Sequence, residues 1–314
     1  MAHSVCKLRH SSVALFAGLA ILMLPASARA KNPRTCGPGV SLKLSSPQSS
    51  QGSLLLVEVR SRMPIAELIG KWGDRSVGFW SLAMGQKSGS VGLRRGLLGV
   101  DLEKPPGTYK FSVDLRTANG KRVTCTLNIP VRRGKFATEK LRVETQFVEP
   151  TPEQIKRANE ERQQLREIFD SVTPEKLWQG SFRVPLDGVS TGGNFGKRRV
   201  LNGQPGSPHG GVDFPAVMGT PVHAAQRGRV VLAQELFFSG NTVVVDHGLG
   251  IYTFYGHLSE IEAKVGEDLG AGAILGKVGA TGRVTGPHLH WGLTVERARV
   301  NPLQIVKLLG NEGV

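Results

Sequence analysis

The sequence is poor in acidic residues, in cysteine and in long hydrophobic runs. Its 314 residues include 25 aspartates and glutamates against 40 lysines and arginines, for a formal net charge of +15, and three cysteines. A basic chain makes nucleic acid one candidate partner, but no nucleic-acid motif or stacking-aromatic pattern accompanies the charge, so this partner is not expected. No cysteine follows Cys125, and thiolate metal ligands are therefore not expected in the second half of the chain.

One apolar run stands out, at residues 13–24, and it follows a positively charged start. It is short for a bilayer span, and a small-x-small cleavage signal, Ala-Arg-Ala, comes soon after it. Residues 1–30 are therefore interpreted as a secretory signal peptide, with an uncleaved anchor as the alternative. Its removal takes away three basic residues and no acid, so the net charge falls from +15 to +12 (15 − 3). No membrane span is expected in the remaining chain.

Two of the three cysteines, Cys36 and Cys125, remain after the signal peptide, whereas Cys6 leaves with it and cannot carry a lipid anchor. In an oxidising compartment such a pair is typical of a disulfide. The bridge would join the start of the exported chain to a later strand and stabilise the protein by roughly 2–4 kcal/mol. Two free buried thiols are the alternative.

Histidine is absent from residues 31–208, so no metal site or chemistry is assigned to the first half of the exported chain. Residues 31–147 show short apolar strand patterns between Gly and Pro, and Asn119-Gly120 is typical of a hairpin turn. We predict an amino-terminal β-sandwich of immunoglobulin-like type. Its strands are expected at residues 53–59, 98–102, 108–113 and 122–127.

Residues 148–178 differ in character and predict a polar helix that links two domains. Thr151 is a capping residue, Pro152 suits the first helical position, and Gln154 completes a capping box. Residues 179–314 return to strand patterns with glycine-rich turns, which predicts an antiparallel β-domain and a mainly β chain. The strands of this domain are expected at residues 229–233, 242–246, 251–255, 274–278 and 289–295.

All six histidines beyond the signal peptide lie in the last third of the chain. His209 and Asp213 are four residues apart, and His288 and His290 alternate across Leu289, so each pair shares one face of an extended strand. Together they predict a metal site with two nitrogens, one oxygen and an open position, which is typical of catalytic zinc. Spacing alone leaves open which of His288 and His290 binds the metal.

Three motifs resemble the lysostaphin and LytM type of zinc metallopeptidase: His-x-x-x-Asp from His209, Tyr-Gly-His-Leu around His257, and Gly-Pro-His-Leu-His-Trp-Gly around His288. The resemblance covers about residues 182–305. It implies that His209, Asp213 and His290 hold one zinc ion and that His257 and His288 are the catalytic histidines. It also implies that the β-domain has the duplicated hybrid motif of this family, whose enzymes cut peptide bonds in bacterial cell-wall peptidoglycan.

The other polar residues near these motifs receive structural interpretations. His223 and His247 are expected to be hydrogen-bonded structural histidines, and Asp246 a turn residue. Asn194 lies in a segment that resembles the family's loop before the first metal motif, and it is a weaker candidate for contact with metal or substrate.

The expected function is that of a zinc metalloendopeptidase acting on the peptide cross-links of peptidoglycan. The alternatives are a non-catalytic wall-binding protein that activates an amidase, and a purely structural zinc site. Peptidoglycan peptide stems and anionic wall polymers are the expected partners, in the periplasm or, alternatively, outside the cell. The sequence leaves open the bond that is cut, the role of the amino-terminal domain, autoinhibition, the oligomeric state and which of His257 and His288 is the base.

Overall fold

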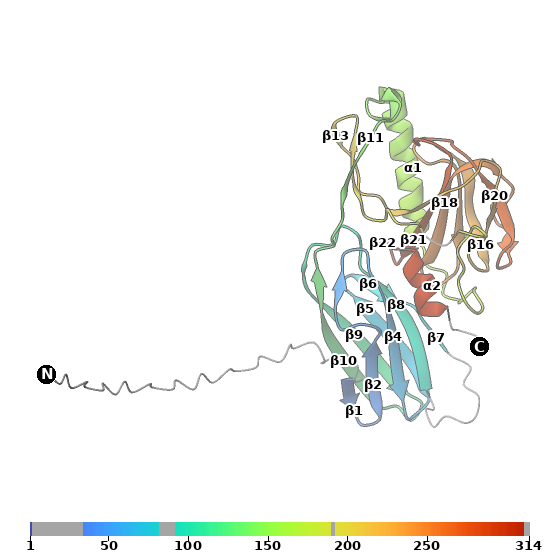
Figure 1. The fold of residues 1–314 in the computed structure, drawn as a ribbon. Coiled ribbons are helices and arrows are strands. Elements are labelled where there is room, and N and C mark those ends of the chain that lie inside the picture. The colour runs from blue at the N-terminus through green and yellow to red at the C-terminus, as the bar shows by residue number, and fades with distance from the viewer. Residues whose placement is uncertain (2–33, 82–91, 190–191, 311–314) are drawn as a thin grey trace. The chain divides into compact units, whose positions relative to one another are not determined.

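Figure 1 shows the computed structural model, which describes residues 34–81, 92–189 and 192–310 together with Met1. The predicted signal peptide therefore lies outside the described residues, apart from Met1. Residues 31–314 are joined by their contacts into a single unit, and this unit is mainly β, as predicted. Neither α-helix among the described residues is long and apolar enough to cross a membrane.

The first part of the unit contains two five-stranded sheets, with strand orders β1-β2-β4-β8-β7 and β3-β10-β9-β5-β6. The pairings are antiparallel except that β3 runs parallel to β10. The strands of the first sheet are β1 (Arg34–Gly37), β2 (Val40–Leu44), β4 (Leu54–Ser61), β7 (Phe79–Ser81) and β8 (Gly92–Gly99). Those of the second are β3 (Ser49–Ser50), β5 (Ile65–Trp72), β6 (Arg75–Val77), β9 (Gly107–Thr117) and β10 (Arg122–Arg132).

Buried side chains of both sheets meet in one hydrophobic core. Val57 and Leu98 of the first sheet belong to the same cluster as Phe111, Val113 and Ile129 of the second. Along β9, buried and more exposed positions alternate because successive side chains point to opposite faces of a sheet. The predicted sandwich is confirmed, and so is the hairpin between β9 and β10, whose turn holds Gly120 at a φ of 83°.

The strand predicted at residues 98–102 is displaced in the structure. β8 begins earlier and ends at Gly99, although Val100 and Leu102 are nearly inaccessible to solvent. The Val100 backbone bonds instead to a turn, donating to the Ser53 carbonyl (2.9 Å) and accepting from Gly52 N–H (3.0 Å). The apolar pattern was therefore a correct sign of burial but a wrong guide to strand pairing, because a buried loop can carry the same pattern.

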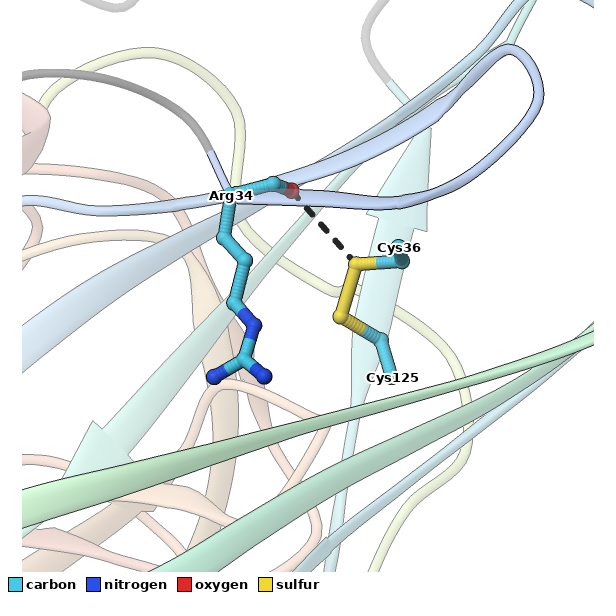
Figure 2. The surroundings of a disulfide bond; sticks show 3 residues. All are labelled: Arg34, Cys36 and Cys125. Atoms are coloured by element: carbon cyan, nitrogen blue, oxygen red, sulfur yellow. Dashed lines mark hydrogen bonds between the residues drawn. A yellow bond between two sulfur atoms is a disulfide. The ribbon is translucent and has the colours of Figure 1, made fainter.

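The predicted disulfide joins Cys36 to Cys125, as Figure 2 shows. It connects β1, at the edge of the first sheet, to β10 in the second, across 89 residues of sequence. The bridge thus closes the sandwich between its two layers.

The predicted helix is confirmed as α1 (Pro152–Asp170), with the Thr151–Gln154 capping box formed in both directions. It is more than a free linker, because Leu165, Ile168 and Phe169 pack against a hydrophobic cluster of the following sheet. Before the helix lie β11 (Thr138–Leu141) and the short 3₁₀ helix η1 (Thr145–Phe147). In Figure 1, α1 is the long green helix.

The carboxy-terminal part is built on a nine-stranded sheet with the main order β14-β21-β18-β17-β16-β19. The bounds of these strands are β14 (Gly211–Pro215), β16 (Gly228–Leu236), β17 (Gly240–Asp246), β18 (Ile251–Ile261), β19 (Asp268–Leu269) and β21 (His288–Val295). Three further strands and a helix join them: β15 (Pro221–His223), β20 (Ile274–Val278), β22 (Ala298–Val300) and α2 (Leu303–Leu309). All the named pairings are antiparallel, as predicted.

A small third sheet joins the segment after the sandwich to the carboxy-terminal part. β11 pairs parallel with β12 (Arg198–Leu201), which pairs with β13 (Gln204–Pro205). Further along the chain, Arg299 of β22 forms an ion pair with Asp101, which follows β8 (2.9 Å). The sandwich and the carboxy-terminal sheet therefore contact one another directly as well as through the connecting segment.

Candidate metal centre and catalytic groove

Three donor atoms converge at the edge strand of the nine-stranded sheet. His209 Nε2, Asp213 Oδ1 and His290 Nδ1 lie 2.8–2.9 Å from one another. The antiparallel register of β14 and β21 places Asp213 directly opposite His290. The apolar neighbours Val212 and Leu289 point the other way and are fully buried, as strand alternation predicts.

His209 is not part of the strand on which the sequence analysis placed it, since β14 begins only at Gly211. Two backbone hydrogen bonds to a preceding loop hold it instead. His209 N–H donates to the Lys197 carbonyl (2.9 Å), and the His209 carbonyl accepts from Gly196 N–H (2.8 Å). Gly211 leaves room for His290, because a Cβ there would lie 2.7 Å from His290 Nε2. Of the two glycines of the first motif, Gly211 thus serves close packing at the site, whereas a Cβ at Gly210 would meet only Arg299, at 3.7 Å.

The three converging atoms are lone-pair acceptors with at most one hydrogen among them, too few to satisfy one another by hydrogen bonds. His209 Nδ1 lies 3.0 Å from the Asn194 carbonyl, and because a carbonyl can only accept, Nδ1 carries the proton. Nε2 then presents a bare lone pair to Asp213 and His290. His290 Nδ1 can supply at most one hydrogen among the three atoms. Such a convergence of lone pairs fits a cation, and two imidazoles with one carboxylate suit zinc.

Electrostatics support the same reading. Burial lowers the pKa of His209 to about 4, so its ring is neutral near neutral pH. Burial alone would raise the pKa of Asp213, but the close contacts of its carboxylate with the imidazoles of His209 and His290 outweigh burial and hold this pKa far below its usual range. A neutral imidazole beside an ionised carboxylate is the protonation state that metal ligation requires.

The second oxygen of Asp213 is held by two residues. Asp213 Oδ2 accepts from Asn194 Nδ2 (2.8 Å) and from Arg199 (3.2 Å). Asn194 also accepts from the backbone N–H of Asp213 (2.9 Å). Asn194 therefore supports both His209 and Asp213 without adding a fourth donor atom to the cluster. No signal in the sequence pointed to the role of Arg199. Outer contacts of this kind orient metal ligands and tune their basicity.

His257 and His288 lie next to this cluster, with ring centroids 4.8 Å apart. His257 Nδ1 contacts the Thr281 carbonyl and His288 Nδ1 contacts the Gly286 carbonyl, both at 2.8 Å. Each Nδ1 therefore carries the proton, and Nε2 is the nitrogen left to accept one. Neither residue belongs to the three-atom cluster, although His288 Nε2 lies 3.8 Å from Asp213 Oδ1.

His257 occupies an unusual backbone conformation. Its φ is 63°, in the left-handed region that residues other than glycine rarely adopt. The register between β17 and β18 shifts at this point, as it does at a β-bulge, and bulges re-aim side chains beside active sites. Burial, with smaller contributions from His290 and His288, lowers the pKa of His257 to about 3. The sheet therefore presents a neutral, strained histidine to the site.

The cluster borders an open groove that has two cavities, of about 300 Å³ and 190 Å³. Both cavities are lined by Arg199, His257 and Arg283, so these side chains lie between the two halves of the groove. Asp213 and His288 line the larger half, while His209 and His290 line the smaller one. A peptide chain could thus pass the metal position from either side.

The remaining candidates have the structural roles expected of them. His247 is fully buried, with Nδ1 bonded to the Arg227 carbonyl (2.8 Å) and Nε2 to the Thr253 hydroxyl (2.7 Å). His223 contacts the Gly272 carbonyl (2.9 Å). Asp246 accepts from Gly248 N–H in the turn after β17 (2.7 Å).

An antiparallel β-sheet on which two imidazoles and a carboxylate converge beside an open groove defines a β-protein with a side-chain cluster able to hold a metal ion. Residues 207–302 match Peptidase family M23, so this part of the chain is an M23 peptidase domain. The match includes both ligand motifs and His257. It confirms the family resemblance that the motifs predicted.

Two curated relatives and one solved structure extend this comparison. The chain is 30% identical over 252 residues to "Peptidoglycan DD-endopeptidase ShyA" of Vibrio cholerae, an alignment that covers 72% of this chain and 54% of the relative. It is 39% identical over 97 residues to "DD-carboxypeptidase/endopeptidase Mpg" of Neisseria meningitidis, which covers 31% of this chain and 22% of the relative. The chain therefore spans about half or less of these curated relatives.

A crystal structure of a peptidase M23 from Pseudomonas aeruginosa is similar over much more of its length. It superposes with a TM-score of 0.62 at 27% identity, and the match covers 84% of this chain and 96% of that one. The similarity therefore reaches well beyond the M23 domain.

Proposed function

We propose that this chain is a zinc metalloendopeptidase that hydrolyses peptide cross-links of bacterial cell-wall peptidoglycan. The observation that carries the proposal is the convergence of His209, Asp213 and His290 beside His257 and His288 in an open groove. The names of the Vibrio and Neisseria relatives support peptidoglycan as the substrate. One zinc ion per chain is the expected stoichiometry, because the three donors face a single point.

A zinc ion held by His209, Asp213 and His290 supplies Lewis acidity, which polarises a peptide carbonyl and lowers the pKa of water. The chain's own groups then handle the protons. His257 and His288 each have Nδ1 occupied by a backbone carbonyl, so Nε2 of either ring is available to accept a proton from water. The same rings can hydrogen-bond the oxygen on which charge develops.

The setting of the enzyme is proposed from several features together. Peptidoglycan lies outside the cytoplasm, and the Cys36–Cys125 disulfide suits an oxidising compartment. The predicted signal peptide supports export, with the periplasm favoured over release from the cell. The domain plan we propose is a signal peptide (1–30), a sandwich (31–147), a helical linker (148–178) and the peptidase domain (179–314). Anionic wall polymers are the proposed partners of the basic surface.

The first test compares the purified mature protein on intact sacculi with and without a metal chelator. Chelator-sensitive release of muropeptides, with about one zinc per chain by elemental analysis, is the expected result. If no products form but a peptidoglycan amidase is stimulated, the protein is an activator and not a peptidase.

A second test separates ligands from catalytic histidines. His209→Ala and Asp213→Ala should lose bound zinc. His257→Ala and His288→Ala should keep it while the rate falls by about 10²–10⁴-fold. Equal zinc loss in all four variants would contradict this division of roles.

A further inference from the structure

Two arginines line the groove without a full set of partners. Arg199 lies on β12, with its side chain 18% exposed, and its Nε is buried with no hydrogen-bond partner among the described residues. Arg283 lies in the segment before β21, and its guanidinium stacks on the Phe238 ring at 4.7 Å from the centroid. No hydrogen bond or ion pair of the Arg283 guanidinium occurs within residues 34–81, 92–189 and 192–310.

The charge balance at this place is strongly positive. Asp213 is the carboxylate that contacts Arg199, and that carboxylate also faces the two ligand histidines. The nearby Glu139 is already paired with Lys197 (2.8 Å). A bound zinc ion would add two further positive charges. Burial, followed by the charge of Arg199, lowers the pKa of Arg283 to about 10, which reflects the lack of a counter-ion.

A half-buried guanidinium without a counter-ion, as at Arg283, is costly, and Arg199 shares its one carboxylate with the two histidines of the cluster. Both therefore point to an anion that arrives with the ligand. The planar guanidinium offers paired N–H groups that match a carboxylate. Stacking on Phe238 restricts the orientation of Arg283 and leaves the edge of the group for binding. Arg199 lies close to the proposed metal position, because the two are on opposite oxygens of one carboxylate. Arg199 contacts Asp213 Oδ2, and Asp213 Oδ1 faces the ligand histidines.

We propose that Arg199 and Arg283 bind a free carboxylate of the peptide stem, close to the scissile bond. The inference rests on the proposed peptidase function and specifies its substrate class. Consecutive Cα atoms are about 3.8 Å apart, so a carboxylate on the residue that carries the scissile nitrogen reaches this position. Peptides with a carboxylate at this position are therefore the expected substrates, and polyglycine bridges, which have no such group, are expected to be poor ones.

The experiment uses three synthetic cross-linked peptides and the zinc-loaded mature protein. One peptide keeps all its carboxylates, one is amidated on the residue that carries the scissile nitrogen, and one is amidated at the chain terminus. kcat and KM are measured for each, and binding of each to the zinc-loaded His288→Ala variant is measured by calorimetry. The protein variants are Arg283→Gln, Arg199→Gln and the control Arg198→Gln, whose side chain is exposed on the same strand.

For the wild-type protein, kcat/KM should be about 10- to 100-fold higher for the peptide that keeps all its carboxylates than for one of the two amidated peptides. Most of this difference should come from a higher KM for the amidated peptide. The amidated form that loses affinity identifies which carboxylate is bound. In Arg283→Gln the preference should shrink toward one, while Arg198→Gln should keep it. Arg199→Gln is compared at equal zinc content, because Arg199 also contacts Asp213.

A merely structural role would lower activity on all three peptides equally, and that result would overturn the proposal. Equal binding of the three peptides in calorimetry would overturn it as well. If the wild type binds the carboxylate form preferentially but cleaves none of the peptides, the peptidase function fails while the binding site stands.

Discussion

Glu296 offers a sharp test of how the sandwich contacts the peptidase domain. It lies in the turn between β21 and β22 and is 6% exposed. Its Oε1 accepts from Gly78 N–H of the sandwich (3.0 Å), and its Oε2 has no partner among the described residues. Burial raises the pKa of Glu296 to about 8, although the Gly78 hydrogen bond and the charges of Arg75 and Arg297 act against it.

The direction of the pH effect follows from proton binding. The native state keeps the proton on Glu296 up to about pH 8, whereas the unfolded chain releases it near the ordinary glutamate pKa of 4.5. The folded state therefore binds more protons in this range, and stability falls as the pH rises from the unfolded pKa through the folded pKa. With a folded pKa of about 8, the loss between pH 7 and pH 9 is about 1.4 kcal/mol.

Above pH 7 the contribution of Glu296 to the pH dependence of stability can be measured separately from that of the histidines. The lowered pKa values of His209, His247 and His257 make stability rise with pH, but this rise is complete once the unfolded histidine pKa of 6.5 is passed. Urea unfolding at about pH 7 and about pH 9 should show the loss in the wild type. Glu296→Gln resembles the protonated carboxyl in shape, so its midpoint should change little between the two conditions.

Equal shifts in the wild type and in Glu296→Gln would refute this reasoning, because the pH dependence would then belong to other groups. A change in the slope of the urea transition would instead indicate that the two parts no longer unfold together. Glu103→Gln is the control: it removes an exposed carboxylate that pairs with Arg299, at another point where the sandwich meets the carboxy-terminal part, and it should leave the pH dependence between pH 7 and pH 9 unchanged.

Three further outcomes are expected. Cys36→Ser, which opens the bridge to Cys125, should lower the free energy of unfolding by about 2–4 kcal/mol, and a reductant should have the same effect on the wild type but none on the variant. Asn194→Ala should weaken zinc binding by about 10- to 100-fold in a chelator competition, because Asn194 orients Asp213, one of the three proposed ligands. Asp101→Asn should destabilise the protein by about 1–2 kcal/mol in urea unfolding, because Arg299 loses one of its two ionic partners and keeps only Glu103; an unchanged midpoint would show that the contact with Asp101 is not stabilising.

Local signals in the sequence predicted the local features well. The capping box at Thr151 formed because its two hydrogen bonds involve neighbouring residues only. The strands around Asp213 and His290 could be placed because alternating burial is a property of each strand alone. Spacing alone predicted that His209 and Asp213 would meet a histidine of the later pair, and the family resemblance was needed to choose His290 over His288.

Features that depend on long-range packing were missed. Arg199 and Arg283 are common surface residues by type, and only the fold shows that both line the groove. The packing of α1 on the sheet was also missed, because most of its residues are charged or polar and only a few apolar ones mark the face that packs. Val100 shows the opposite case. The apolar pattern around it correctly predicted that Val100 is buried but wrongly predicted that it belongs to a strand.

The position of His209 links the site to the segment that leaves the sandwich. His209 is held by the backbone of residues 194–197, and this loop leads directly into β12. β12 in turn pairs with β11, whose Glu139 holds Lys197 and lines the groove. A boundary at residue 179 would therefore remove one wall of the groove and the strand that supports the ligand loop. We infer that the smallest unit with an intact groove includes β11, although residues 138–141 fall in the part of the sequence assigned to the sandwich domain.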